Sequence, residues 1–232
     1  MYKLSEETPH GLYQLTTPKA VLFDWDNTLV DTYHTIWVAM NKTLSHFGFP
    51  PLSLEDVYND PGHSIRDFFP KFFGEQHKEA CLIFNEAYKV ATKNNLRTFA
   101  YVQHLLEMLH EQGIYIAAVS NKEGYHLRSE AKLLKIETFF QKMVGSQDTH
   151  ADKPSPVPLL DALAPSQIEP GLHVWFVGDS EVDVLCAQNA GCTPVLIHRP
   201  EKNYNGAHNV QNCQELKKII LQSLKEDKNI HN

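Results

Sequence analysis

The chain has 232 residues, of which 42% are hydrophobic and 21% are charged. This composition is typical of globular proteins and excludes collagen-like, coiled-coil and disordered chains. Acidic residues number 28 and basic residues 21, for a net charge of −7, which argues against nucleic acid or an anionic membrane as the main partner. No apolar window of about 18 residues predicts a membrane span. The four cysteines lack metal-binding spacing, and we expect a reducing, cytoplasmic setting.

Short apolar runs with polar ends are the strongest strand candidates. They lie at 20–23, 114–119, 173–177 and 194–197, with a weaker one at 143–144. Runs that are apolar throughout are typical of a parallel sheet covered on both faces. Helical periods separate them, at 105–110, 127–134 and 182–189. This alternation predicts an α/β fold built on a doubly wound parallel sheet.

One long segment interrupts the alternation. Between Asp31 and Arg97 we predict no strand, but two helical stripes begin near Tyr33 and Cys81. An insertion of this length exceeds an ordinary βα loop, and we expect a small helical cap over the carboxyl edge of the sheet. The predicted division is an N-terminal tail at 1–18, an α/β core at 19–30 and 98–232, and the cap domain at 31–97.

Carboxylates follow two of the predicted strands. Asp24 ends the first apolar run, and Asp26 lies two residues later, on the same side of an extended chain. Asp179 follows the run at 173–177, and Asp183 lies one helical turn further on. A turn or a helix cap explains each pair taken alone. Together the pairs predict an oxygen-rich site suited to Mg²⁺.

Groups suited to an anion occupy two more of these positions. Ser120 and Asn121 follow the run at 114–119, where a hydroxyl and backbone N–H groups at a helix start would bind an anion. Lys153 lies in a loop stiffened by prolines, where its ammonium would face phosphate oxygens. A plain N-cap serine and a solvated loop lysine are the alternatives. The occurrence of all these groups at strand ends favours a single pocket.

The residues 24–30, DWDNTLV, resemble the first motif of the haloacid dehalogenase-like hydrolase superfamily. Ser120, Lys153 and the segment 178–183 are similar to its second, third and fourth motifs, and the place of the insert resembles the phosphoglycolate phosphatase and β-phosphoglucomutase branch. Two departures stand out. Asn27 replaces the usual glycine, a change that a left-handed turn tolerates. The segment 97–101 lacks the Pro-Gly pair common where the cap returns to the core.

The resemblance implies a Mg²⁺-dependent phosphatase that hydrolyses a small phosphomonoester through an aspartyl-phosphate. Asp24 would be the nucleophile and Asp26 the general acid and base. The remaining implied roles are Mg²⁺ binding by Asp24, Asp179 and the Asp26 backbone carbonyl, support by Asp183, and phosphate binding by Ser120, the Asn121 backbone N–H and Lys153.

We expect the predicted cap at 31–97 to determine which substrate binds. Arg66 is the candidate cap residue for substrate specificity, with a surface arginine as the alternative. The expected partner is a small phosphorylated metabolite, with neither nucleic acid nor membrane. Two other functions stay open: a phosphomutase of the β-phosphoglucomutase type, and a catalytically silent binding or regulatory module that keeps the fold.

Overall fold

The computed structural model describes residues 15–60, 62 and 64–230. The predicted tail at 1–18 therefore falls largely on residues 1–14, which lie outside the described residues. Six parallel strands form one sheet in the order β3-β2-β1-β4-β5-β6. Their bounds are β1 (Ala20–Phe23), β2 (Tyr115–Glu123), β3 (Lys142–Ser146), β4 (Val174–Gly178), β5 (Thr193–Ile197) and β6 (His208–Val210). The predicted α/β fold with a parallel sheet is confirmed, and β6 is an additional strand at its edge.

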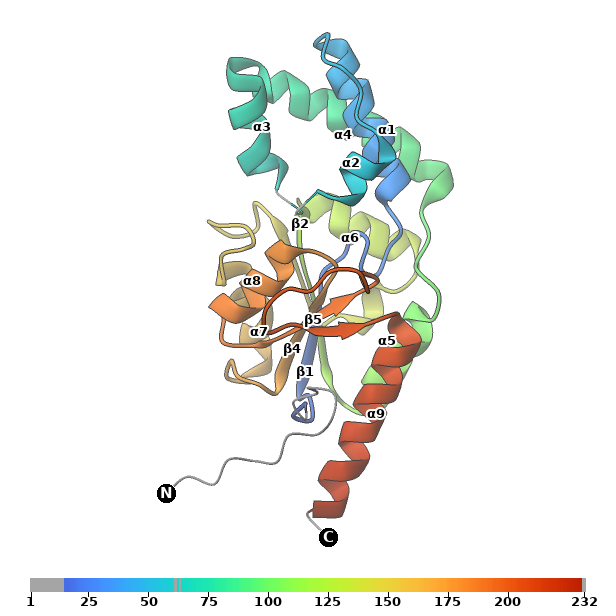
Figure 1. Cartoon of the computed structure of the whole chain (residues 1–232), viewed down its shortest axis with the longest axis vertical. Coiled ribbons are helices and arrows are strands. Elements are labelled where there is room, and N and C mark those ends of the chain that lie inside the picture. The colour runs from blue at the N-terminus through green and yellow to red at the C-terminus, as the bar shows by residue number, and fades with distance from the viewer. Residues whose placement is uncertain (1–14, 61, 63, 231–232) are drawn as a thin grey trace.

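Helices cover both faces of this sheet (Figure 1). One face packs on α5 (Val102–Glu111), α6 (Gly124–Leu133) and α9 (Cys213–Ile230). The other packs on α7 (Val157–Leu163) and α8 (Glu181–Asn189). Within β1, Val21 and Phe23 face the first layer while Ala20 and Leu22 face the second, and all four are fully buried. This two-sided burial is why the strand is apolar at every position.

A second group of helices follows β1 and lies at the top of the view in Figure 1. It consists of α1 (Tyr33–His46), α2 (Leu54–Tyr58), α3 (Ile65–Phe73) and α4 (His77–Asn95). These helices have a hydrophobic cluster of their own, rich in aromatic residues such as Phe69, Phe73 and Phe84. Three short 3₁₀ helices complete the elements: η1 (Gly74–Gln76), η2 (Glu137–Phe139) and η3 (Ala164–Ser166).

The chain enters and leaves these four helices along neighbouring segments. Val30 and Thr98 form a β-bridge, and Asp31 N donates to Arg97 O at 3.0 Å. The Arg97 guanidinium also lies 2.7 Å from the Asp31 carboxylate. These contacts fall at the ends of the segment expected to form the cap, while the division into domains stays a prediction. No helix in the described part of the chain is long and apolar enough to cross a membrane.

Candidate active site

The first strand leads directly into the site. The Asp24 backbone N–H donates to Val177 O at 2.8 Å, so β4 fixes the start of the loop that follows β1. Asn27 adopts φ 61°, which confirms that asparagine supplies the left-handed turn here. The turn places Thr28 Oγ1, as a donor, 3.0 Å from Asp24 Oδ2. The Asp24 side chain is therefore oriented by its own loop.

Close packing of β4 against α8 places the second pair of carboxylates. An added Cβ at Gly178 would lie 2.3 Å from Asp183 Cβ and Cγ, so the strand and the helix approach this closely because residue 178 is glycine. Ser180 donates from N and Oγ to Asp183 Oδ2, at 3.1 and 2.6 Å. Ser180 is thus the N-cap of α8, as the helix-cap alternative predicts. Asp179 takes no part in this capping contact.

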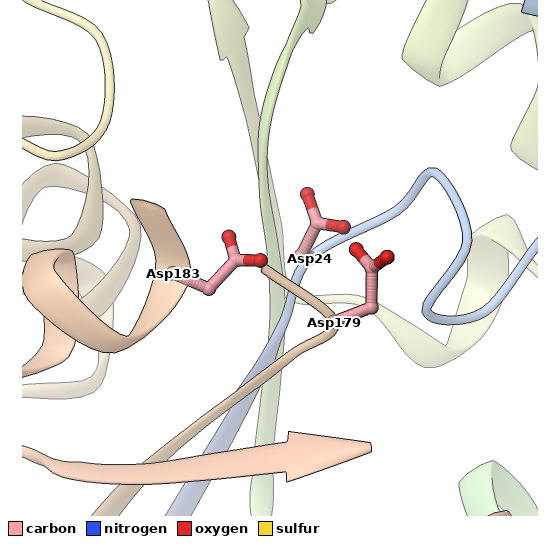
Figure 2. Close-up of side chains that lie close together, drawn as sticks. All are labelled: Asp24, Asp179 and Asp183. Carbon is pink, nitrogen blue, oxygen red and sulfur yellow. The ribbon is translucent and has the colours of Figure 1, made fainter. Parts of the chain in front are cut away.

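Figure 2 shows the carboxylates of Asp24, Asp179 and Asp183 close together, Asp24 from the loop after β1, Asp179 from the stretch that joins β4 to α8, and Asp183 from the start of α8. One oxygen of each lies within 4.8 Å of the others, and all three residues are buried. Lys153 Nζ lies 2.5 Å from Asp24 Oδ1 and 2.7 Å from Asp183 Oδ1. The structure thus brings four of the predicted site residues into one cluster, which we call the acid cluster.

The acid cluster has unusual electrostatics. Burial raises the pKa of Asp24 to about 8, although Lys153 opposes the shift. Burial and the Asp183 carboxylate raise the pKa of Asp179 to about 7, although Arg199 opposes that shift. The three carboxylates meet two buried cations, Lys153 and Arg199. One negative charge is left over, and a proton or a metal cation would balance it.

The donor set fits Mg²⁺, which binds through one or two carboxylates together with water and substrate phosphate. Asp179 Oδ1 accepts no hydrogen bond from any described residue, since both partners of this carboxylate bind Oδ2. Asp183 has both oxygens occupied, one by Lys153 and the other by Ser180. Asp24 also has a partner on each oxygen, Thr28 on Oδ2 and Lys153 on Oδ1. Within the described acid cluster, Asp179 Oδ1 is thus the carboxylate oxygen left open to a metal ion, with Asp24 facing it, and Asp183 is suited to hold Lys153.

The end of β2 differs from the predicted helix start. β2 continues to Glu123, and α6 begins only at Gly124, because Glu123 pairs with Ser146 of β3. Ser120 is buried and lines the cavity described below. The Asn121 side chain clasps the neighbouring loop: Oδ1 accepts from Lys153 N at 2.9 Å and Nδ2 donates to Lys153 O at 3.1 Å. Asn121 thereby fixes the backbone of Lys153, a contact that its sequence position did not indicate.

Asp26 belongs to a polar network beside the acid cluster. Lys122 Nζ donates to Asp26 Oδ1 at 2.7 Å, to Glu130 Oε2 at 2.7 Å and to Tyr88 Oη at 2.6 Å. Trp25 Nε1 donates to the same Glu130 oxygen at 2.7 Å. The Lys122 side chain is 7% exposed, and the opposing carboxylates hold its pKa well above the ordinary value despite burial. Asp26 therefore has one oxygen fixed by a buried ammonium.

Arg199 and Tyr33 are site residues that sequence reasoning missed. Arg199 Nη2 lies 3.2 Å from Asp179 Oδ2, and Tyr33 Oη donates to the same oxygen at 3.0 Å. The guanidinium stacks 3.6 Å from the centre of the Tyr58 ring. Arg199 stands two residues beyond the apolar run of β5, so the rule that found Asp24 and Asp179, a polar group after a strand, also points to it. Tyr33 carries no such signal.

Arg66 lies apart from the acid cluster. Its guanidinium contacts Asp152 Oδ1 at 3.1 Å and donates to Thr149 O at 3.2 Å. Both partners belong to the loop before Lys153, and Arg66 is absent from the described lining of the cavity. The structure therefore places this side chain against the core loop, and its role in specificity stays a prediction.

A cavity of about 250 Å³ opens over the acid cluster. Its polar end includes Asp24, Asp26, Ser120, Lys153 and Asp179. The opposite end is formed by side chains of α1 to α4. Asp24 and Asp179 follow β1 and β4, adjacent strands at the point where the strand order reverses, which is where doubly wound sheets bind their ligands.

Comparison with known proteins agrees with this geometry. The model of the haloacid dehalogenase-like hydrolase family matches residues 21–197. The phosphoglycolate phosphatase of Haemophilus influenzae is 31% identical over 189 residues, which are 76% of this chain and 84% of that protein. The pyrophosphatase PpaX of Anoxybacillus flavithermus is 31% identical over 174 residues, 74% of this chain and 79% of that one.

A solved structure extends the likeness to three dimensions. The haloacid dehalogenase-superfamily hydrolase of Ehrlichia chaffeensis has 31% sequence identity and a TM-score of 0.65, and the match covers 90% of this chain and 98% of that one. The predictions of the family and of a hydrolytic enzyme are confirmed. The chain belongs to the haloacid dehalogenase-like hydrolase family.

Proposed function

We propose that this enzyme is a Mg²⁺-dependent phosphatase that hydrolyses a small phosphomonoester through an aspartyl-phosphate on Asp24. The observation that carries the proposal is the acid cluster: a buried Asp24 paired with Lys153 and facing Asp179 at the floor of a cavity. The relatives named as phosphatases support the same reaction class.

Asp24 and Asp179, with the backbone carbonyl of Asp26, would hold Mg²⁺. The ion would neutralise the repulsion between a phosphate dianion and the carboxylate that attacks it. Asp183 holds the Lys153 ammonium toward Asp24. That arrangement keeps a positive charge beside the attacking oxygen, where it would also contact an oxygen of the phosphoryl group.

Asp24 and Asp26 divide the two chemical steps. In the first, an Asp24 oxygen forms a bond to phosphorus, the bond to the leaving oxygen breaks, and Asp26 gives that oxygen a proton. In the second, Asp26 takes a proton from a water molecule that attacks phosphorus. The Asp24–phosphorus bond then breaks, and inorganic phosphate leaves. The ammonium of Lys122 on one oxygen of Asp26 orients the carboxyl for both transfers.

The phosphoryl oxygens need donors as charge is redistributed in the transition state. The Ser120 hydroxyl, the Asn121 backbone N–H and the Lys153 ammonium are suited to this, because all three residues line the cavity near Asp24. Loss of one such donor costs roughly 3 kcal/mol of transition-state stabilisation in comparable sites.

Phosphate release with and without Mg²⁺ tests the proposal, with Asp24→Asn as the inactive variant and Asp161→Asn, a half-exposed residue of α7, as the matched control. We expect Asp24→Asn to reduce release to the background and Asp161→Asn to leave it unchanged. Beryllium fluoride with Mg²⁺ should raise the melting temperature of the wild type but not of Asp24→Asn. Equal rates in the wild type and Asp24→Asn would refute the nucleophile. Isomerisation of a sugar phosphate without phosphate release would indicate the phosphomutase instead.

A further inference from the structure

The end of the cavity away from the acid cluster is lined mainly by apolar side chains, and we call it the apolar end. Its lining side chains come from all four helices that follow β1 and from the loop between α1 and α2. Most are aliphatic or aromatic: Ile36, Met40, Leu44, Leu52, Val57, Ile65, Phe68, Phe69, Phe72, Phe84 and Tyr88. Several of them, including Ile36, Met40 and Ile65, are only partly buried although they pack on the hydrophobic cluster of these helices. The cluster is therefore left open on the side that faces the reacting groups.

No described cation from these four helices lines this apolar end. The charged lining residues there are Asp56 and Asp60, and both already accept hydrogen bonds. Asp56 Oδ2 accepts from Ser53 N and Oγ at 2.7 Å, and Asp60 Oδ1 accepts from Gly62 N at 2.7 Å. Arg66, the arginine expected to reach the site, is held by Asp152.

The described lysines and arginine of the polar end are committed to carboxylates. Lys153 is paired with Asp24 and Asp183. Lys122 donates to Asp26 and Glu130. Each of these ammonium groups is surrounded by acceptors, so neither is available to a second anionic group of a ligand without breaking a buried ion pair.

Arg199 completes the lysine and arginine side chains of the described lining, and the His126 ring also lines the cavity, against the Tyr88 ring. Arg199 contacts Asp179 and stacks on Tyr58. Its Nε and Nη1 have no hydrogen-bond partner among the described residues, and both atoms are buried rather than open to the cavity. A carboxylate on the substrate would therefore have to displace Arg199 from its stack to be recognised there.

We propose, building on the phosphatase function above, that the substrate is the phosphate ester of an apolar alcohol, with an alkyl or aromatic body and no charge beyond the phosphate. The phosphate would lie at the acid cluster, and the body would fill the apolar end between α1, α3 and α4. Covering this open hydrophobic surface removes apolar area from water on both partners. An apolar cavity of this kind binds apolar ligands because water gains few hydrogen bonds within it.

The experiment measures kcat/KM for phosphate release, with Mg²⁺, from ethyl, butyl, hexyl and phenyl phosphate, alongside phosphoglycolate as the ester with a carboxylate. Along the alkyl series we expect kcat/KM to rise by about fourfold per methylene until the cavity is full, which corresponds to burial of each CH₂ group. The rise should come mainly from KM, since the contact is the same in ground state and transition state. Phosphoglycolate should be a poorer substrate than butyl phosphate.

Two variants locate the effect. Phe72 lines the cavity and is 44% exposed, so Phe72→Ala should fold and should reduce the gain from ethyl to hexyl phosphate. Leu82→Ala is the control, because Leu82 is 72% exposed on α4 and is not among the lining residues. Rates independent of chain length, a preference for phosphoglycolate, or equal effects of both variants would overturn the inference. Failure to release phosphate from any ester would instead refute the proposed function.

Discussion

At the scale of single residues, the acid cluster combines burial with an excess of negative charge. In the described part of the chain, the carboxylates at 24, 179 and 183 face two ammonium or guanidinium groups, those of Lys153 and Arg199. Such a site favours whatever cation neutralises it, whether proton or metal. This competition connects the geometry of the acid cluster with the proposed chemistry.

Mg²⁺ affinity should therefore depend on pH. Burial raises the pKa of Asp24 to about 8 and that of Asp179 to about 7, so a proton competes with the metal for these carboxylates as the pH falls from 8 to 6. In the metal-free chain these raised pKa values stabilise the fold at low pH, and that contribution is lost as the pH rises through about 8. We expect Mg²⁺ binding to tighten from pH 6 to 8, by up to about tenfold per pH unit for each proton released.

Titration calorimetry at several pH values measures this dependence, and buffers of different ionisation enthalpy count the protons released. Asp179→Asn should flatten the dependence, because one titrating ligand is removed. Binding of equal strength at pH 6 and pH 8 would contradict the competition between proton and metal.

Lys122 is the second residue that carries a prediction. Lys122→Met removes the ammonium that Asp26 and Glu130 share, and leaves the Glu130 carboxylate buried with Trp25 as its remaining partner. We expect the free energy of unfolding to fall by about 3–5 kcal/mol, as when one partner of a buried pair is lost. Urea denaturation measures this change in the free energy of unfolding.

Lys89→Met is the control, at an exposed position of α4, and it should change the free energy of unfolding by about 0.5 kcal/mol or less. A comparable loss in both variants would show that the network around Lys122 contributes little.

At the scale of elements, the apolar runs predicted five of the six strands because each of the five carries apolar residues buried between the two helix layers. β6 was not predicted because only Val210 of its three residues is buried, so the strand has no apolar run. The groups that follow strands, Asp24 and Asp179, were predictable for the same reason: a parallel sheet gathers its carboxyl ends at one edge. Contacts across the fold, such as those of Tyr33 with Asp179 and of Lys122 with Glu130, produce no periodic pattern in the sequence and could not be predicted from it.

The approach of β4 to α8 gives a prediction at this scale. Gly178→Ala would put a Cβ 2.3 Å from Asp183, so the helix or the carboxylate must move. We expect activity to fall sharply, because Asp183 holds Lys153, together with a loss of stability of about 1–3 kcal/mol from overpacking. Gly191→Ala is the control: it meets nothing within 4 Å and is strained only by φ +70°.

Thermal denaturation and phosphate release together separate the two glycine variants. Gly191→Ala should lose a similar amount of stability, roughly 1–2 kcal/mol from the left-handed backbone, and keep its activity. Full activity in Gly178→Ala would show that the position of Asp183 has little bearing on the reaction.

At the scale of the whole molecule, the site is assembled from two groups of helices and one sheet. Tyr33 of α1 and the backbone of Tyr58 in α2 reach Asp179 and Arg199 beside the sheet, and Tyr88 of α4 reaches Lys122. These three contacts between the inserted helices and the core therefore end on residues that line the polar end of the cavity. These hydrogen bonds couple the position of the inserted helices to the positions of the side chains in the site.

A substitution at Arg66 tests whether its contact holds the inserted helices in place or selects the substrate. Arg66→Met breaks the ion pair with Asp152, whose side chain is 1% exposed, while Ser146 Oγ still donates to that carboxylate. If Arg66 positions α3 against the Lys153 loop, the variant lowers kcat/KM for alkyl and carboxylate-bearing phosphate esters by the same factor and lowers the melting temperature. If Arg66 selects the substrate, the ratio between the two esters changes instead. We expect the uniform loss, because the guanidinium ends on the core loop and not in the cavity, and a changed ratio measured on the purified variant would restore the specificity role.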